Sequence, residues 1–170
     1  MRWRSALPDP VRALAVADGE RVLAGAVAAD GAVLAGTAEA LYLSWVRGDV
    51  RRIGWERVQR ASWSPDDGVL AVSEVGEFGG ERPVHRFGLE YEARFLAFLR
   101  ERIASTVLVQ RHVPIHGARG VFVIARRAAG GERAVTWLYE FEEGVDVTDP
   151  AVLAAAEAAL ARARDEVGDL

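Results

Sequence analysis

The first part of the chain alternates short apolar runs with turn residues, which is the pattern of an antiparallel sheet. Asp30-Gly31 separates apolar runs at 22–28 and 32–36, and an Asp-Gly pair in this setting predicts a β-hairpin. A turn at 64–68 and a Gly- and Glu-rich loop at 76–81 separate later runs. Further strands are predicted at 40–46, 50–55, 57–63, 69–75 and 83–89, with a bend near Glu56.

From Glu90 the apolar spacing changes to that of a helix. Pro114 must lie beyond the end of this helix, and the β-branched residues within 106–109 suit a strand as well as a last helical turn. One helical face is predicted to carry Tyr91, Phe95, Phe98, Leu99 and Ile103, at intervals of three and four residues.

A β-β-α unit is predicted to follow. Strands at 119–127 and 134–142 flank a connection at 129–132, and with a turn centred on Gly130-Gly131, Arg119 would lie opposite Glu142. The same register predicts one apolar face made of Phe122, Ile124, Val135, Trp137, Tyr139 and Phe141.

A last helix is predicted to begin with Asp149 as N-cap and Pro150 in the first position, and to end at Gly168. Its apolar stripe is predicted as Leu153, Ala156, Leu160, Ala163 and Val167.

Composition excludes several chemistries. All 21 basic residues are arginine, and the chain has neither cysteine nor asparagine. Thiol nucleophiles, disulfides, thiolate metal sites, Schiff-base lysines and P-loop lysines are therefore excluded. An alanine- and arginine-rich chain without lysine or asparagine points to a GC-rich genome rather than to functional selection.

The same inventory sets expectations for location. Pro8 and Pro10 interrupt the N-terminal segment, so no signal peptide is predicted. The longest apolar stretch, 22–46, contains Asp30 and Glu39, so no transmembrane helix is predicted there. We expect a soluble cytoplasmic protein.

Two passages of the predicted sheet carry a family resemblance. The first leaves a strand through Leu34 to Thr37 and re-enters at Leu41-Tyr42-Leu43, and the second reads Arg52-Ile53-Gly54-Trp55-Glu56-Arg57-Val58, followed by Trp63. With seven strands followed by one helix, they resemble bacterial pleckstrin-homology-like (PH-like) and GRAM-like domains over roughly residues 20 to 105. The whole chain resembles a family of actinobacterial proteins that supplies no active site to carry over.

The resemblance implies an α+β fold: a PH-like bent antiparallel sheet or partly open barrel with a capping helix, followed by the β-β-α extension. Together with the pattern along the chain, it predicts an N-terminal segment at 1–19, a PH-like domain at 20–109 and a β-β-α extension at 110–170 packed on it. Lipid-binding members hold head-group phosphates with basic residues in the first strand-turn-strand region. Here that region has no arginine and carries Asp30, so this chain departs from their pattern.

Candidate ligand-binding residues come from the basic cluster in the PH-like part. Arginine suits bidentate contacts with phosphate or carboxylate, but Asp49 and Glu56 lie within the cluster, and a salt-paired surface is the competing interpretation. The candidates are Arg47, Arg51, Arg52 and Arg57, with Arg60 nearby.

A second basic stretch runs from Arg111 to Gly131 without an acid, and an acidic stretch follows from Glu140 to Asp149. The net charge of −4 and the absence of a basic stripe with interleaved aromatic residues argue against nucleic acid. A protein partner of mixed charge fits this pattern better.

Metal and catalytic interpretations rest on three histidines and the acidic stretch. On a strand, His112 and His116 would stand about 13 Å apart, too far to share an ion. His85 lies alone on its strand, and the acids lack the spacing of a calcium loop. No catalytic residue, metal or cofactor is predicted, and Trp45, Trp55, Trp63 and Trp137 are predicted in the core or at its edge.

The sequence thus favours a non-enzymatic PH-like interaction module that binds a protein partner or a second copy of itself. One alternative is a binder of small anions or lipid surfaces that uses the arginine cluster. Another is a metal-dependent hydrolase built on His112, His116 and the acidic stretch. Partner identity and oligomeric state stay open.

Overall fold

The computed structural model describes residues 6–76, 82–130 and 134–168. The chain divides into two units: the first contains 1–106 and 128–131, and the second contains 107–127 and 132–170. The sequence analysis placed the corresponding boundary at residue 109. Most of the loop predicted at 76–81 and part of the connection predicted at 129–132 lie outside the described residues.

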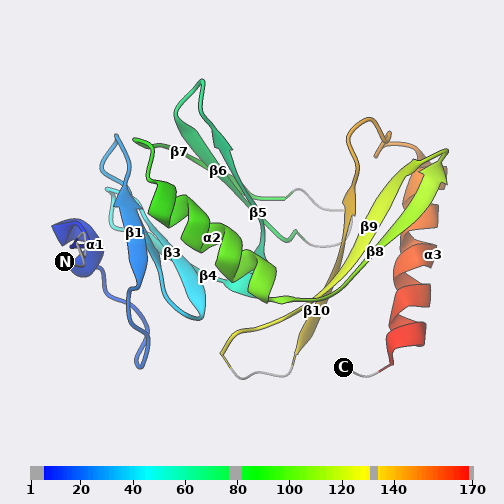
Figure 1. Cartoon of the computed structure of the whole chain (residues 1–170), viewed down its shortest axis with the longest axis horizontal. Coiled ribbons are helices and arrows are strands. Elements are labelled where there is room, and N and C mark those ends of the chain that lie inside the picture. The colour runs from blue at the N-terminus through cyan, green and yellow to red at the C-terminus, as the bar shows by residue number, and fades with distance from the viewer. Residues whose placement is uncertain (1–5, 77–81, 131–133, 169–170) are drawn as a thin grey trace. The chain divides into compact units, whose positions relative to one another are not determined.

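The first unit contains two antiparallel meanders (Figure 1). Sheet A has the order β1-β2-β3-β4 and sheet B the order β5-β6-β7. All seven predicted strands and the bend, here the short helix η1, are confirmed. Their bounds are Ala24–Val27 (β1), Val33–Gly36 (β2), Ala40–Ser44 (β3), Val50–Gly54 (β4), Trp55–Arg57 (η1), Val58–Ser64 (β5), Val69–Glu74 (β6) and Val84–Gly88 (β7).

Helix α2, Ala93–Ser105, lies across the two sheets and contacts β1, β5 and η1 (Figure 1). It buries Phe95, Leu96 and Leu99 in the core between the sheets. Tyr91 lies before the first helical residue and is 69% exposed, so its predicted place on the buried helical face is wrong.

The two passages that carry the family resemblance meet in this core. The indole Nε1 of Trp55 donates to the carbonyl of Thr37 at 3.0 Å, and Trp55 is fully buried. The ring of Phe98 packs edge-on against it, at 5.8 Å between centroids. A Cβ at Gly36 would stand 2.3 Å from the Phe98 ring, so this glycine makes room for the helix.

The N-terminal segment covers part of the outer face of sheet A. It forms a short helix, α1 (Asp9–Arg12), although the sequence analysis treated its prolines only as interruptions. Val11 is fully buried and packs with Ala35 and Tyr42, while the alternate residues of the same strands face the core.

The second unit is a three-stranded antiparallel sheet, sheet C, of order β10-β9-β8, with helix α3 on one face (Figure 1). Asp149 accepts a hydrogen bond from the amide of Ala151 at 2.8 Å, and Gly168 ends α3 at φ 69°, so the predicted helix bounds are confirmed. The elements are β8 (Val107–His116), β9 (Arg119–Arg127), β10 (Val135–Phe141) and α3 (Pro150–Val167).

The buried stripe of α3 differs in part from the predicted one. Ala156, Leu160 and Ala163 are buried as predicted, but Val152 and Ala159 take the places expected of Leu153 and Val167.

The predicted register of β9 and β10 is wrong by one residue. Ile124 pairs with Leu138 and Val123 with Tyr139, and the amide of Glu142 donates to the carbonyl of Gly120, so Arg119 is not its partner. A shift by one residue exchanges the two faces of a strand. The face toward α3 therefore carries Val121, Val123, Trp137, Tyr139 and Phe141, while Phe122 and Ile124 lie on the opposite face.

The fold is thus α+β, with three antiparallel sheets and a C-terminal helix. None of the three sheets closes into a barrel within the residues that the structure describes.

Replacing Asp149 with alanine is expected to destabilise the second unit by about 1 kcal/mol, because the first turn of α3 loses its side-chain acceptor. Urea unfolding followed by circular dichroism measures the change. Asp165→Ala is the matched control on the same helix, and we expect it to leave the stability within about 0.5 kcal/mol of the parent chain. Equal losses in both variants would contradict the capping role.

Candidate functional site

The arginines of β4 do not form one cluster. Side chains of successive strand residues point to opposite faces, so Arg51 and Arg52 leave sheet A in opposite directions. Each of them meets a carboxylate that comes from a distant part of the sequence, as the following contacts show.

Arg51 joins a part-buried polar cluster with residues of sheet B. Its Nε and Nη2 donate to the two carboxylate oxygens of Glu74 at 2.6 and 2.7 Å, and His85 Nε2 lies 2.6 Å from the same carboxylate. The ring of Trp45 covers His85 at 5.5 Å between centroids. Burial alone would raise the pKa of Glu74, but hydrogen bonds from Arg51 and His85 outweigh it and hold this pKa below its ordinary value.

Arg52 belongs to a second polar cluster on the outer face of sheet A. Its Nη2 and Nε donate to Glu20 Oε1 at 2.6 and 2.8 Å, and Nε also donates to the Tyr42 hydroxyl at 3.1 Å. The hydroxyl of Thr37 donates to the other oxygen of Glu20 at 2.6 Å. Burial would raise the pKa of Glu20, but the bonds from Thr37 and Arg52 lower it further than burial raises it.

The two remaining candidates lie apart from these clusters. Arg47 is exposed in the turn between β3 and β4, and Arg57 in η1 donates to the carbonyl of Val75 at 3.2 Å. The four predicted ligand-binding arginines thus lie on two faces of sheet A, in one turn and in the short helix η1. The sequence analysis did not identify Glu74 as the partner of Arg51 or Glu20 as the partner of Arg52. The two residues of each pair are more than twenty positions apart in the sequence.

The Glu74 cluster makes the first unit sensitive to acid. A carboxyl group whose pKa is lowered on folding stabilises the fold above its unfolded pKa, and this contribution is lost as pH falls. Between about pH 5.5 and pH 3.5, the melting temperature of the parent chain is expected to fall more steeply than that of Glu74→Gln. Glu101→Gln, at an exposed glutamate, is the control that should keep the parent slope. Equal slopes for Glu74→Gln and the parent would contradict the assignment.

Two acidic residues of the second unit, Glu142 and Asp146, have hydrogen-bond partners within that unit. Glu142 accepts from the Gly120 amide at 2.6 Å and lies 2.7 Å from His112 Nε2, and these contacts lower its pKa. Asp146 accepts from the amide and the hydroxyl of Thr148, which lowers the pKa of Asp146. His112 and His116 both lie on β8. Over 6–76, 82–130 and 134–168, no three histidine or acidic groups gather as a metal site would require.

A row of valines, interrupted by one serine, crosses the outer face of sheet A. Val27 pairs with Val33, Val33 with Ser44, and Ser44 with Val50, so three valines and a serine lie side by side across all four strands. Val46, in the adjoining turn, stands beside Gly31. We call Val27, Val33, Val46 and Val50 the valine row.

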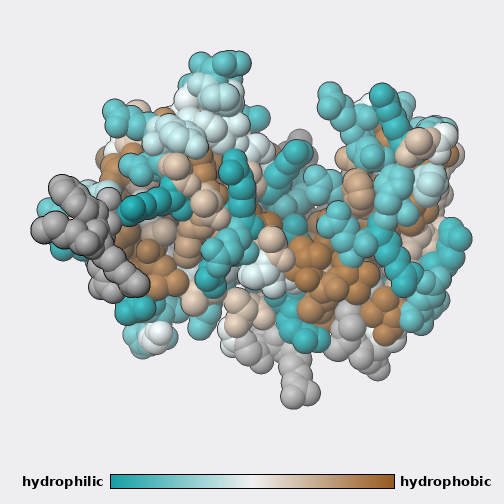
Figure 2. Space-filling view, in the orientation of Figure 1, coloured by the Kyte–Doolittle hydropathy of each residue, from teal (hydrophilic) through white to brown (hydrophobic). Residues whose placement is uncertain are grey.

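The valine row lies next to the part of this face that the N-terminal segment buries, and Val33 is itself half-buried against that cluster. Val46 is 73% exposed, Val50 51% and Val27 37%. Hydrophobic residues are visible at the surface over β1 in Figure 2. Asp30, Arg47 and Asp49 lie in the adjoining turns and provide charges of both signs. These three exposed valines make this part of sheet A a candidate contact surface.

Within the described residues, no helix is both long enough and apolar enough to cross a bilayer.

Comparison of the chain with protein-family models, with curated proteins and with solved structures finds no match.

Proposed function

We propose that the first unit is a PH-like interaction module, which acts by binding a protein rather than by catalysis. The observation that carries the proposal is the valine row, in which Val27 of β1, Val46 of the β3–β4 turn and Val50 of β4 are exposed. Burying exposed valine side chains contributes about 25 cal/mol for each Å² of apolar surface removed from water. Charged residues at the ends of the valine row would orient a partner.

The order of elements supports the PH-like part of the proposal. Four strands form one meander, three form a second, and a helix follows that packs against both. The contact of Trp55 with Thr37 gives a structural reason for the two sequence passages that resemble PH-like domains.

Contacts of the arginines favour a protein partner over an anionic ligand. Arg51 and Arg52 would have to leave Glu74 and Glu20 before they could hold a phosphate. The turn between β1 and β2 carries Asp30 instead of a cation. An anionic ligand at Arg51 or Arg52 would therefore meet an occupied guanidinium group, whereas an apolar protein surface meets exposed valines.

The proposal is tested with Val46→Asp combined with Val50→Asp. Two carboxylates in the valine row would be desolvated on binding, so we expect at least a tenfold loss of affinity. Sedimentation velocity over a concentration series measures self-association. Affinity capture from the native cell extract, followed by titration of the purified partner, measures binding to another protein.

Val147→Asp is the matched control, because Val147 is another exposed valine, 49% accessible, in the second unit. Under the proposal, Val147→Asp should show the same self-association and the same partner binding as the parent chain. If the double variant and the parent associate equally with themselves and with every purified partner, the valine row is not the binding surface.

A further inference from the structure

The N-terminal segment 6–22, which we call the strap, crosses the outer face of sheet A beside the valine row. Strand pairing places Gly25, Ala35, Tyr42 and Arg52 side by side in the row next to the valines. The strap contacts this neighbouring row from β1 to β4. It therefore occupies the surface into which the valine row would otherwise extend.

Side chains, and not strand pairing, hold the strap on the sheet. Val11 is its one fully buried side chain, and it fills the notch left by Gly25, where a Cβ would lie 2.4 Å from Val11 Cγ1. The amide of Ala17 donates to the Tyr42 hydroxyl at 3.0 Å. Within the part of the chain that the structure describes, the first backbone bond to a sheet backbone comes only after the strap, from the amide of Leu23. The strap can thus leave without breaking a strand pairing of sheet A.

Glu20 closes the strap at its C-terminal end. Its almost fully buried carboxylate accepts from Arg52 Nη2 and from the Thr37 hydroxyl, each at 2.6 Å. Arg52 Nη2 also lies 3.7 Å from the partly exposed carboxylate of Glu39, in the turn between β2 and β3. Arg52 therefore has a second carboxylate within reach that does not belong to the strap. Release of Glu20 would not leave the guanidinium without an anion.

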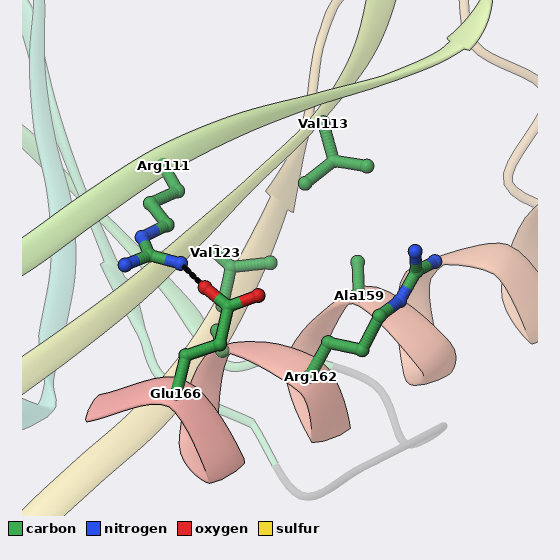
Figure 3. Close-up of a pocket in the computed structure, with 7 residues that line it drawn as sticks. Arg111, Val113, Val123, Ala159, Arg162 and Glu166 are labelled. Atoms are coloured by element: carbon green, nitrogen blue, oxygen red, sulfur yellow. Dashed lines mark hydrogen bonds and ion pairs between the residues drawn. The ribbon is translucent and has the colours of Figure 1, made fainter. Parts of the chain in front are cut away.

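An ion pair between two elements does not by itself make such a closure. In the second unit, Arg111 of β8 pairs with Glu166 of α3 beside an open groove (Figure 3). Helix α3 also buries Ala156, Leu160 and Ala163 against sheet C. Loss of the Arg111–Glu166 pair is therefore expected to leave α3 in place, and this pair supplies a control for the strap.

We propose that the strap is an autoinhibitory segment, which opens at Glu20 and uncovers the neighbouring row for a protein partner bound at the valine row. This inference rests on the proposed function of the valine row. With the strap closed, a partner meets the exposed valines alone. With the strap open, it also meets Ala35 and Tyr42, next to Val33, and the larger apolar contact gives a higher affinity.

Opening is measured by amide hydrogen exchange of the full chain, resolved by mass spectrometry. Glu20→Gln is expected to speed exchange in the strap at least about fivefold, because charge-assisted bonds to the carboxylate are weakened. Exchange in β1 and β2 should stay at the parent rate. Asp18→Asn, at an exposed acid of the strap, and Glu166→Gln are the controls that should change nothing in the strap. A strap that exchanges only together with β1 and β2 in every variant would overturn the proposal.

Two further variants test the parts of the closure separately. Glu39→Gln removes the second carboxylate of Arg52, so it disfavours the open state and should slow exchange in the strap. Val11→Ala weakens the apolar anchor without changing any charge, and it should speed exchange in the strap. Faster exchange in Glu39→Gln, or an unchanged rate in Val11→Ala, would contradict the assigned contacts.

A labelled peptide with the sequence of residues 6–22 tests whether the uncovered row can be occupied from outside. It can bind the full chain only where the chain's own strap has opened, and an apparent affinity rises with the open fraction. Fluorescence anisotropy is therefore expected to show at least about fivefold tighter binding to Glu20→Gln than to the parent. Equal affinities would contradict a displaceable strap.

The link to the valine row is tested last, with the self-association or the purified partner that the valine row supports. Glu20→Gln should raise that affinity by about the same factor as it raises peptide binding. An unchanged affinity in a variant whose strap opens would refute the autoinhibition and leave the valine row as the binding surface. Unchanged binding by Val46→Asp with Val50→Asp would instead refute the proposed function, whatever the exchange of the strap.

Discussion

Replacing Trp55 with alanine is expected to cost the first unit about 3 to 5 kcal/mol, the loss typical of a large aromatic side chain removed from a core. Trp55 is fully buried, and its ring packs against Phe98 of α2. The substitution also removes the indole donor from the carbonyl of Thr37. Since whole domains are stable by about 5 to 15 kcal/mol, such a loss leaves the first unit close to unfolding.

Two further variants define the origin of the Trp55 effect. Trp55→Phe keeps most of the packing but removes the indole donor, so a loss of about 1 to 2 kcal/mol is expected. Trp63→Ala removes a tryptophan that only borders the core, and its cost should be less than that of Trp55→Ala. Urea unfolding monitored by amide NMR resolves the two units. Equal costs at Trp55 and Trp63 would contradict the central position of Trp55.

Gly120→Ala is expected to be the most damaging small substitution in the second unit, with a loss of about 3 kcal/mol or more. A Cβ at this position would lie 1.9 Å from the carbonyl oxygen of Val113 and 2.7 Å from the Cα of Pro114. These are backbone atoms of the paired strand β8, so relief requires the two strands to separate. The carbonyl of Gly120 also accepts a hydrogen bond from the amide of Glu142, the residue that follows β10.

Gly117→Ala in the same hairpin is the control. It has φ 61° and open space around the new Cβ, so only the conformational cost of about 1 kcal/mol applies. Chemical unfolding of both variants measures the difference. Similar losses at Gly117 and Gly120 would show that close approach of the strands at Gly120 is not what the substitution disturbs.

The sequence predicted turns and helix ends correctly where neighbouring residues determine the backbone conformation. Asp30-Gly31 marked the first hairpin, and Gly31 has φ 88°, a conformation that favours glycine. Asp149 and Gly168 marked the ends of α3 because capping is a contact between neighbours in the sequence. The short helix at Asp9–Arg12 was missed, since four residues carry too little periodicity to identify it.

Pairings between distant residues could not be predicted in the same way. Pairing of Arg127 with Val135 centres the connection on residue 131, whereas the glycine pair suggested a centre between Gly130 and Gly131. That small difference exchanged the faces of β10 relative to β9. Glu20 and Glu74 were likewise missed as partners of Arg52 and Arg51, because only the folded sheets bring them together.

Part of the proposed binding surface could be located from the sequence. Val27 and Val33 lie on either side of the predicted Asp30-Gly31 turn, at distances that differ by one residue. Val50 begins the fourth strand. Their exposure depends on how much of sheet A the N-terminal segment covers, which the sequence does not reveal.

Photo-crosslinking from position 46 tests the central claim, binding of a protein through the valine row, most directly. A benzophenone amino acid replaces Val46 in the full chain in its native cells, and position 147 carries it in the control. We expect a specific protein adduct from position 46 that disappears when Val50→Asp is added. Adducts of equal yield and identity from positions 46 and 147, or none from position 46, would contradict the account.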